Sequence, residues 1–359
     1  MKVGRMARVL HVISARAGDG AEHQLRLLIR HLPQQSEVVT LSPPGPVLDA
    51  LRADGTAVHE LVSSRDLDLG TILGLRRLAR RGGFDVVHCH LFRAGVQGRP
   101  AAWLAGIARV VATEYHVEAG ARAIYRAAER LGQVTVAVSP AVAERLRRWG
   151  VPPERVVVIP KGIDPQEFRF DAGLRAAARA RLRIPPGTPV IGGLGRLEPR
   201  QRFDVLIRAV GEVPGAVLVL VGDGSSRHAL ERLAAIEGVA DRVRFTGPVR
   251  HAREMLCAMD VFASPGRETF GLAVLEAIAA GLPALYAACP PLDGTRVDGT
   301  RRLTAHDPES LPRGLRAEVL CVAERSGGRL AARSAGDRYD AERVAAEVGE
   351  LYERAAGSA

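Results

Sequence analysis

Short apolar runs alternate with longer segments of mixed polarity along the whole chain. Segments such as 21–32 and 340–355 place apolar residues three or four positions apart, which is typical of helices with one buried face. The alternation predicts an α/β protein with doubly wound parallel sheets, and the number of strands favours two sheets. The runs with the composition of buried strands are 9–13, 37–41, 86–88, 110–113, 134–138, 190–193, 216–221, 243–245 and 261–263.

A boundary between two domains is expected near the middle of the chain. A proline- and glycine-containing stretch at 159–164 leads into an arginine-rich helix near 174–183, and Pro-Pro-Gly follows at 185–187. With 359 residues, the chain is long enough for two domains that each bury a core. We predict an N-terminal domain at 1–165, a C-terminal domain at 166–339 and a final helix at 340–359.

The segment from Asp260 to Pro283 is the most informative part of the sequence. Val261 to Ala263 is typical of a short buried strand, which the turn sequence Ser-Pro-Gly then ends. A helix is predicted from Phe270 to Ala280, with a glycine and a proline just after it as stop signals. A helix that begins above a sheet directs its first free amides toward a ligand, and such amides bind anions.

Two carboxylates flank this helix start. Glu268 is expected in the turn and Glu276 about two turns into the helix, so both can face one pocket. Carboxylates accept hydrogen bonds from hydroxyl groups, of which sugars and riboses carry many. Two solvated glutamates are the commoner arrangement for an arbitrary pair, but the surrounding turn and helix signals favour a nucleotide-sugar site.

A second candidate segment follows the strand at 190–193. Gly195 lets a backbone approach a ligand closely, and Arg196, Arg200 and Arg202 on the same loop can bind phosphate through bidentate contacts. The Gly-Asp-Gly turn at 222–224 and the Thr-Gly-Pro turn at 246–248 end the next two strands. Taken singly, these two turns are ordinary strand-to-helix connections.

Composition narrows the class of protein. The chain is 47% hydrophobic and 25% charged, no apolar run has the length of a membrane span, and no secretory leader is evident. The formal net charge of +10 is spread along the chain, and only 4% of residues are aromatic, which argues against nucleic-acid binding. We expect a cytoplasmic protein.

Basic clusters at 76–81 and 145–148 leave open a peripheral contact of the protein with anionic lipid. A solvated helix face is the commoner interpretation of such clusters.

Cysteines and histidines give no sign of a metal site. Cysteines 89, 257, 289 and 321 are scattered in apolar surroundings, which favours buried free thiols in a reducing compartment. His88 and His90 end a strand two positions apart, but no nearby carboxylate completes a ligand set. We therefore expect hydrogen-bonded histidines, with neither a metal nor a cofactor.

Together these segments resemble the retaining glycosyltransferases of family 4, which have the GT-B fold: two Rossmann-like doubly wound domains that face a central cleft. The resemblance covers roughly residues 7–285 and the last helix. It rests mainly on Gly195-Arg196 and on Glu268 and Glu276, which match the family's two glutamates separated by seven residues. It implies that the C-terminal domain binds a nucleotide-sugar, the N-terminal domain binds the acceptor, and the final helix packs back on the N-terminal domain.

The resemblance also implies roles for individual residues. His116, Glu268 and Arg196 match the catalytic positions, with Glu268 near the donor sugar and His116 beside the reacting carbon. Gly18, Gly20, Glu22 and His90 would lie on the acceptor side. The donor-binding positions are Gly195, Arg196, Arg200, Gln201, Arg202, Gly222, Thr246, Gly247, Pro248, Phe270, Gly271, Leu272 and Glu276.

The chain departs from the family pattern in several places. Gln201 stands where the family has a lysine that binds the donor diphosphate, and a neutral amide cannot supply that charge. Asp19 replaces the first glycine of the family's Gly-Gly turn, and one extra residue separates Thr113 from His116. The segment 286–303 lacks the usual Gly-Gly turn and charged helix. Arg200 or Arg202 is a candidate to replace the missing lysine.

The activity implied is retaining, metal-independent transfer of a hexose from a nucleotide diphosphate-sugar to an acceptor hydroxyl. A UDP-sugar is favoured over a GDP-sugar, and the acceptor is a glycan, a lipid-linked glycan or a natural product, as in polysaccharide biosynthesis. Three alternatives stay open: an epimerase of the same fold, a nucleotide-sugar-binding protein with weakened catalysis, and, on charge alone, a nucleic-acid binder.

Overall fold

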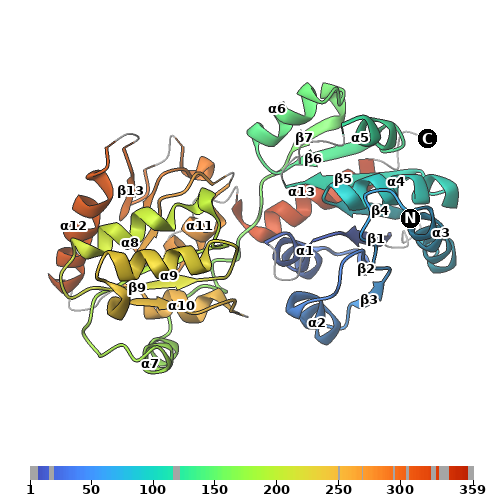
Figure 1. Ribbon diagram of the computed structural model, residues 1–359. Coiled ribbons are helices and arrows are strands. Elements are labelled where there is room, and N and C mark those ends of the chain that lie inside the picture. The colour runs from blue at the N-terminus through green and yellow to red at the C-terminus, as the bar shows by residue number, and fades with distance from the viewer. Residues whose placement is uncertain are drawn as a thin grey trace. The chain divides into compact units, whose positions relative to one another are not determined.

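A computed structural model describes residues 7–15, 20–115, 122–249, 251–268, 270–293, 296–304, 307–324, 329–330 and 339–354. The chain divides into two compact units, Met1–Gly162 with Ala341–Ala359, and Ile163–Asp340. Each unit has its own parallel sheet with helices packed against it (Figure 1). Both are Rossmann-like, which confirms the predicted doubly wound α/β fold.

The first unit is built on a seven-stranded sheet in the order β3-β2-β1-β4-β5-β6-β7, in which all neighbours are parallel. Its strands are β1 (Arg8–Ile13), β2 (Gln35–Thr40), β3 (Ala57–Glu60), β4 (Val86–His90), β5 (Arg109–Glu114), β6 (Val134–Ala137) and β7 (Val156–Val158). Its helices are α1 (Gly20–His31), α2 (Pro46–Ala53), α3 (Leu69–Gly82), α4 (Phe92–Ala105), α5 (Arg122–Glu129), α6 (Pro140–Arg148) and α13 (Ala341–Arg354), with a short 3-10 turn at Pro153–Arg155.

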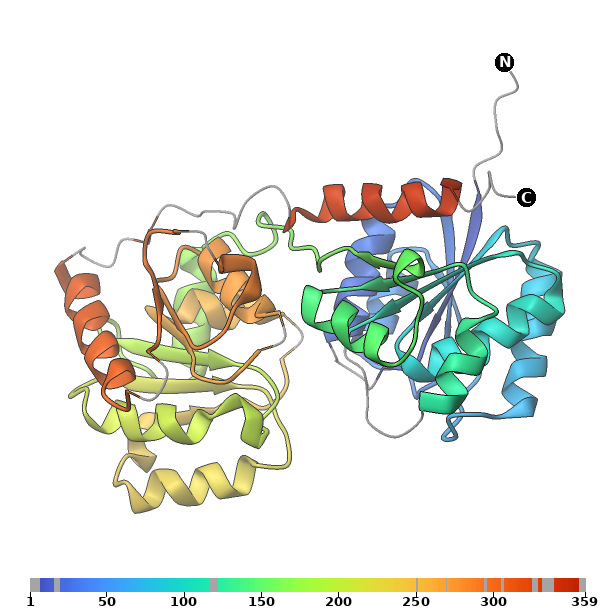
Figure 2. The same cartoon turned by 90° about the horizontal axis from the view of Figure 1, so that it is seen from above.

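The last helix covers one face of this sheet. Its residues Ala345, Val348, Leu351 and Tyr352 are buried in one cluster with side chains from β1, β4, β5 and β6. Figure 2 shows α13, in red, beside α1. The chain therefore returns to its first unit after completing the second, and α13 belongs to the core of the unit in which the chain begins.

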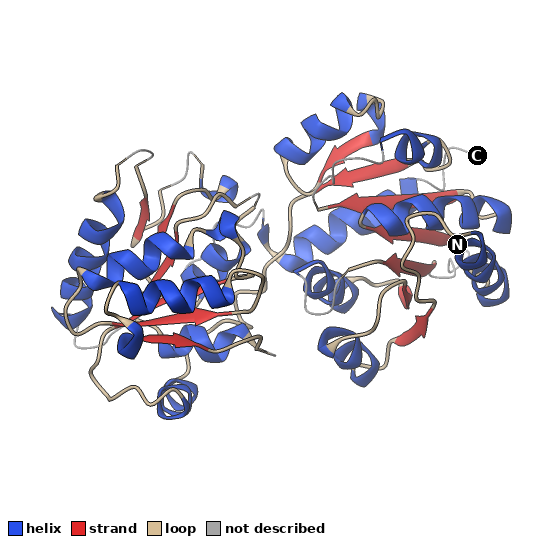
Figure 3. Cartoon of the chain, in the orientation of Figure 1, coloured by secondary structure: helices blue, strands red, loops and turns tan. Residues whose placement is uncertain are grey.

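The second unit is built on a six-stranded parallel sheet in the order β10-β9-β8-β11-β12-β13. Figure 3 shows its strands between helices. The strands are β8 (Val190–Leu194), β9 (Val217–Val221), β10 (Val243–Phe245), β11 (Val261–Ser264), β12 (Ala284–Tyr286) and β13 (Thr300–Arg302). The helices are α7 (Ala172–Arg181), α8 (Phe203–Gly211), α9 (Arg227–Ile236), α10 (Ala252–Ala258), α11 (Leu272–Ala279) and α12 (Ser310–Glu324), with 3-10 turns at Pro199–Gln201, Ala240–Arg242 and Pro290–Leu292.

A buried ion-pair cluster ties the arginine-rich helix α7 to strand β11. The Asp260 carboxylate accepts hydrogen bonds from Arg175 and Arg179, both at 2.6 Å, and from the backbone amide of Val190 at 2.8 Å. Arg179 also donates to the carbonyl of Ala258 at the end of α10. Charged groups this far from water are tolerated because each has several partners, and the cluster fixes the start of β11.

The predicted strands are all present, but four further strands were missed. These are β3, β7, β12 and β13, which are only three or four residues long, and β13 consists of Thr-Arg-Arg. Helix α11 begins at Leu272, two residues later than predicted, because Gly271 has a φ of 89°. Glu276 consequently lies a little over one turn into the helix. Cysteines 89, 257 and 289 are buried as expected, whereas Cys321 is partly exposed.

Candidate active site

Four loops of the second unit meet at one edge of its sheet. They follow β8, β9, β10 and β11, which are neighbours in the sheet and run in the same direction. Their carboxyl ends therefore lie side by side, at the edge where open α/β sheets bind ligands. The donor-binding positions expected from the sequence lie on these four loops and on helix α11, which follows the last of them.

The first three loops are joined by backbone hydrogen bonds. Gly195 donates to the carbonyl of Val221 at 3.0 Å, and Gly222 donates to the carbonyl of Gly247, also at 3.0 Å. A β-carbon on Gly222 would stand 2.0 Å from the Gly195 carbonyl oxygen. Only glycine permits this approach, so residue 222 fixes how closely the loops can pack.

The fourth loop, which carries Glu268, packs on the arginine-containing loop. A β-carbon on Gly266 would stand 2.6 Å from the Arg200 carbonyl oxygen and 2.7 Å from the Gln201 α-carbon. Glu268 follows two residues later and is partly buried. The structure thus brings the turn before Glu268 against the segment that holds the arginines, although Gly266 and Gln201 are 65 positions apart in the sequence.

Two arginines of the loop share one carboxylate. Glu198 pairs with Arg196 through one oxygen and with Arg200 through the other, both at 3.2 Å. The two guanidinium groups are therefore held close together on one side of the loop. Both side chains are about half exposed, so an anionic ligand can reach them.

Arg202 is directed elsewhere. It has a φ of 55° and pairs with Asp204 at 3.3 Å, and Asp204 also pairs with Arg208 of α8. Gln201 lies between Arg200 and Arg202 in sequence, is 8% exposed, and has its amide nitrogen 3.3 Å from where a Gly195 β-carbon would be. Of the two candidates for the missing cation, Arg200 and Arg202, Arg200 is the one held beside Arg196.

Helix α11 presents its N-terminus at the same edge. Val274 and Leu275 both donate to the Gly271 carbonyl, so the amides of Leu272 and Ala273 precede the first bond within the helix. Phe270 is buried, with its ring 5.8 Å from that of Tyr339 in an edge-on contact. On the neighbouring loop, the Thr246 hydroxyl donates to the Gly247 carbonyl at 2.7 Å, and Pro248 is exposed.

Sequence reasoning missed two charged residues of this region. No role was predicted for Glu198, although its carboxylate pairs with two arginines. Arg227, at the start of α9, has its guanidinium 5.8 Å from the Phe245 ring centre and lies beside Gly247. A basic residue three positions after the Gly-Asp-Gly turn was a signal that could have identified Arg227.

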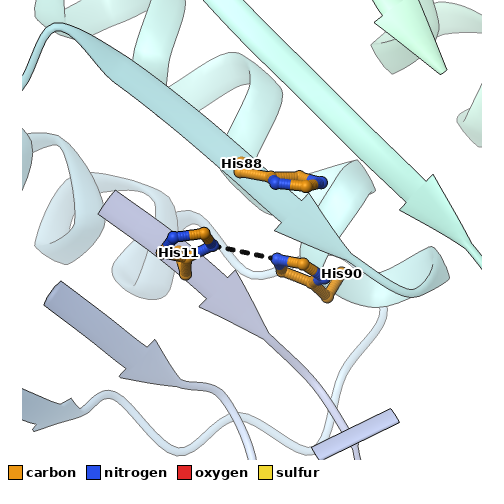
Figure 4. A group of neighbouring side chains, drawn as sticks. All are labelled: His11, His88 and His90. Carbon is orange, nitrogen blue, oxygen red and sulfur yellow. Dashed lines mark hydrogen bonds between the residues drawn. The ribbon is translucent and has the colours of Figure 1, made fainter. Parts of the chain in front are cut away.

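In the first unit, three buried histidines form a network of one shared hydrogen bond and close ring contacts (Figure 4). His11 Nδ1 lies 3.1 Å from His90 Nε2, and His88 lies 2.6 Å from the Tyr352 hydroxyl and 2.8 Å from the Thr113 hydroxyl. All three histidines are fully buried. The sequence singled out His88 and His90, but His11 and Tyr352 are brought to them only by the sheet order and by α13.

The ring nitrogens of these histidines lie close enough to one another to hold a metal ion. Both nitrogens of each ring, however, already have a partner, since His11 also contacts Ser36 and His90 also contacts Tyr115. Burial lowers the pKa of His11 to about 3 and that of His88 and His90 well below 6.5. The arrangement is therefore that of neutral histidines, of which His11 and His90 bond to each other and His88 bonds to Tyr352 and Thr113.

Other first-unit residues also lie near the carboxyl edge of the sheet. Gly20 begins α1, Glu22 in its first turn is buried, and Gln24 bonds both the amide and the carbonyl of Gly162 at 2.9 Å. The Lys161 ammonium lies 5.4 Å from the Tyr115 ring centre. Gly18 and His116 fall outside the described residues. A small hollow of about 40 Å³ is lined by His90, Thr113, Tyr115, Gln24 and Lys161, among others.

Two Rossmann-like units, with donor-loop candidates at the carboxyl edge of the second sheet, are the architecture of the GT-B fold, and sequence comparison identifies the family. The model described as Glycosyltransferase Family 4 matches residues 18–167, and that described as Glycosyl transferases group 1 matches residues 188–319. A D-inositol 3-phosphate glycosyltransferase of Xylanimonas cellulosilytica is 33% identical over 318 residues, covering 78% of this chain and 75% of the relative. The chain belongs to glycosyltransferase family 4.

One further sequence relative and two solved structures are also similar to most of the chain. A GDP-mannose-dependent alpha-(1-6)-phosphatidylinositol monomannoside mannosyltransferase of Mycobacterium tuberculosis is 34% identical, over 66% of this chain and 67% of its own length. Among solved structures, Anabaena Alr3699/HepE in complex with UDP and glucose superimposes with a TM-score of 0.82 at 20% identity, covering 97% of this chain and all of that one. The sucrose-phosphate synthase of Thermosynechococcus elongatus has a TM-score of 0.72 at 19% identity, over 98% of this chain and all of its own.

The chain is thus a transferase that moves a sugar from a nucleotide-sugar donor to an acceptor. Among the described residues, no helix is both long and apolar enough to cross a bilayer.

Proposed function

We propose that this chain is a retaining, metal-independent hexosyltransferase whose second unit binds a nucleotide diphosphate-sugar, with a UDP-sugar favoured over a GDP-sugar. The observation that carries the proposal is the Arg196–Glu198–Arg200 arrangement on the loop against which the Glu268 turn packs. Two guanidinium groups and the amides at the start of α11 are the groups expected to stabilise a departing diphosphate.

Arg200 takes the place of the family's loop lysine in this proposal. Its ion pair with Glu198 holds it beside Arg196, whereas the Asp204 pair draws Arg202 toward α8. A guanidinium carries a permanent charge and can contact two phosphate oxygens, so Arg200 can supply what the neutral Gln201 amide cannot. Glu198 orients the two arginines before the donor arrives.

The proposed reaction breaks the bond between the anomeric carbon and the diphosphate oxygen and forms a bond from the acceptor oxygen to the same face of that carbon. The acceptor proton passes to an oxygen of the departing diphosphate, so the nucleotide leaves as its diphosphate. Glu268 contacts the donor sugar and Glu276 the ribose hydroxyls. Positioning and charge stabilisation then supply the rate enhancement, and the chain need not form a covalent intermediate.

The acceptor is assigned to the first unit, with Gly18, Gly20, Glu22, His90 and His116 as the candidate contacts. The name of the Xylanimonas relative contains D-inositol 3-phosphate, and that of the Mycobacterium relative contains phosphatidylinositol monomannoside and GDP-mannose. These names support an acceptor hydroxyl on a phosphate-bearing polyol or lipid-linked glycan, which includes the possibility of a peripheral contact with anionic lipid. They also keep a GDP-sugar as the second choice of donor.

The test measures thermal stabilisation of the protein by UDP-, GDP- and dTDP-sugars, followed by release of the nucleotide. We expect one donor class to raise the melting temperature, and Glu268→Gln to lose turnover while it still binds that donor. Arg200→Ala should weaken donor binding by about tenfold, in keeping with about 1.4 kcal/mol for one charge-assisted contact, and Arg202→Ala by less than about twofold.

A donor-binding protein with weakened catalysis is the second candidate, and Gln201 at the lysine position is the observation that favours it. Stabilisation by a donor without release of the nucleotide, with every acceptor class offered, would support this candidate. Failure of every donor to stabilise the protein would contradict both. Equal losses in Arg200→Ala and Arg202→Ala would contradict only the assignment of Arg200.

A further inference from the structure

The second unit has a basic hollow, which is formed by β13, the segment after it and the start of α12. Its volume is about 290 Å³, and it is lined by Arg301, Arg302, Thr304, Asp307, Ser310, Arg313 and Gly314. The hollow would hold a phosphate group together with part of the molecule that carries it. The sequence analysis gave these residues no role in donor binding.

The hollow is separate from the donor loops. Strand β13 is the outermost strand of the order β8-β11-β12-β13, so β12 lies between it and the strand that leads to Glu268. Because the strands are parallel, the chain leaves β13 at the edge that also carries the donor loops. The segment 286–303, which departs from the family pattern, supplies two of the arginines.

Carboxylates orient two of the three guanidinium groups. Arg302 pairs with Asp293 at 3.0 Å, and Arg313 pairs with Asp307 at 2.6 Å. Their side chains are 60% and 63% exposed, so the pairing leaves them open to a ligand. A guanidinium has five N–H donors, and one carboxylate contact leaves others free for a second anion.

Asp307, just before α12, already has partners on both carboxylate oxygens, which limits its repulsion of an anion. One carboxylate oxygen accepts from the Glu309 amide at 3.0 Å, and the other pairs with Arg313. The third arginine, Arg301, is exposed, and its stem lies on α12 at Gly314, where an added β-carbon would be 3.4 Å from the Arg301 δ-carbon. The Arg301 stem thus lies within contact distance of α12, and the residue lines the hollow.

We infer that this hollow binds the phosphate group of a mono- or diester. Three guanidinium groups exceed the two carboxylates around them, and the hydroxyls of Thr304 and Ser310 add neutral donors to the same wall. A tetrahedral phosphate has enough oxygens to contact groups that converge from a strand and a helix. A divalent cation does not suit a wall on which arginine predominates.

The experiment titrates inorganic phosphate into the full chain in low-salt buffer and follows the ³¹P line width. The test variants are Arg301→Ala, Arg313→Ala and both together. Arg316→Ala is the matched control, because Arg316 lies one turn further along α12 and pairs with Glu212 at 2.9 Å, outside the hollow. Arg196→Ala removes the phosphate contact expected at the donor loops, so the result does not depend on the proposed function.

In the Arg196→Ala background, we expect saturable broadening that weakens at least about fivefold in the double variant and stays within about twofold in Arg316→Ala. Melting temperatures show that the variants are folded. A second arm measures flotation of the protein with phosphatidylglycerol vesicles and with phosphatidylcholine vesicles. Saturable binding of inorganic phosphate without flotation on either kind of vesicle identifies a soluble phosphate ester as the ligand. Flotation with phosphatidylglycerol alone, lost in the double variant and kept in Arg316→Ala, identifies a lipid headgroup.

Either result supports the site. Equal responses of wild type and the double variant in both arms would overturn it, as would an equal loss in Arg316→Ala, which would reflect net charge. Absence of binding in both arms would overturn it as well.

Discussion

Gly266 lies directly on the backbone of Gln201: a β-carbon added at Gly266 would stand 2.7 Å from the Gln201 α-carbon. This contact joins the turn before Glu268 to the loop that carries Arg196 and Arg200. Real β-carbons do not approach backbone atoms this closely, so a methyl group at position 266 must push the two loops apart.

Gly266→Ala should therefore weaken donor binding strongly and destabilise the second unit by about 1–3 kcal/mol, as overpacking typically does. Donor affinity by calorimetry and unfolding by circular dichroism measure the two effects. Gly211→Ala is the control, because an added β-carbon there would meet only a Val239 methyl group at 3.8 Å. A Gly266→Ala protein that binds donor as wild type does would contradict the proposed link between the loops.

Gln201→Lys should compensate for the loss of Arg200. In the Arg200→Ala background, a lysine at position 201 adds back one positive charge at the position where the family carries it. We expect the double variant to recover most of the roughly tenfold loss of donor affinity. Gln201→Met in the same background adds no charge and should recover nothing. Equal affinities of the lysine and methionine variants would show that charge at this loop is not what the donor requires.

The Asp260 cluster should make a large contribution to the second unit. Asp260→Asn leaves the buried Arg179 without its charged partner, and loss of one member of such a pair costs about 3–5 kcal/mol. Arg181→Ala, on the same helix but 57% exposed, should cost less than about 1 kcal/mol. Both tryptophans, Trp103 and Trp149, lie in the first unit, so the change should appear in circular dichroism and not in tryptophan fluorescence.

The histidine network should make the first unit sensitive to acid. Burial lowers the pKa of His11 from 6.5 to about 3, so below pH 6.5 the unfolded chain takes up a proton that the folded chain does not. The resulting stability is complete above pH 6.5 and is lost as the pH falls. His11 alone should account for about 2 kcal/mol between pH 7.5 and pH 5, and His88 and His90 add to it.

Urea unfolding followed by tryptophan fluorescence at the two pH values measures this loss. The free energy of unfolding of His11→Asn should depend less steeply on pH than that of wild type, because one of the three histidines with a lowered pKa is gone. His228→Asn is the control, since the His228 side chain is 88% exposed and lies in the other unit. Equal pH dependence in wild type and His11→Asn would contradict the assignment of the effect to the buried network.

The strands and the main helices could be predicted because their signals are local. The run 217–221 is continuously apolar, as strands buried on both faces tend to be, and glycines end helices where a residue with positive φ is needed. Strand β13 was missed because Thr-Arg-Arg has no apolar pattern, and it pairs only because β12 presents a free edge.

Sequence alone determined the two doubly wound sheets, the family resemblance, and the residues of the donor loops and glutamate turn, because each rests on residues that are neighbours in the chain. The tertiary structure decided which of these groups meet. Glu198 joins Arg196 to Arg200 and leaves Arg202 to Asp204, and Gly266 lies on Gln201 across 65 positions. His11 reaches His90 only because β1 and β4 are adjacent in the sheet. Such contacts depend on strand order and on the absence of single β-carbons, neither of which has a local signature in the sequence.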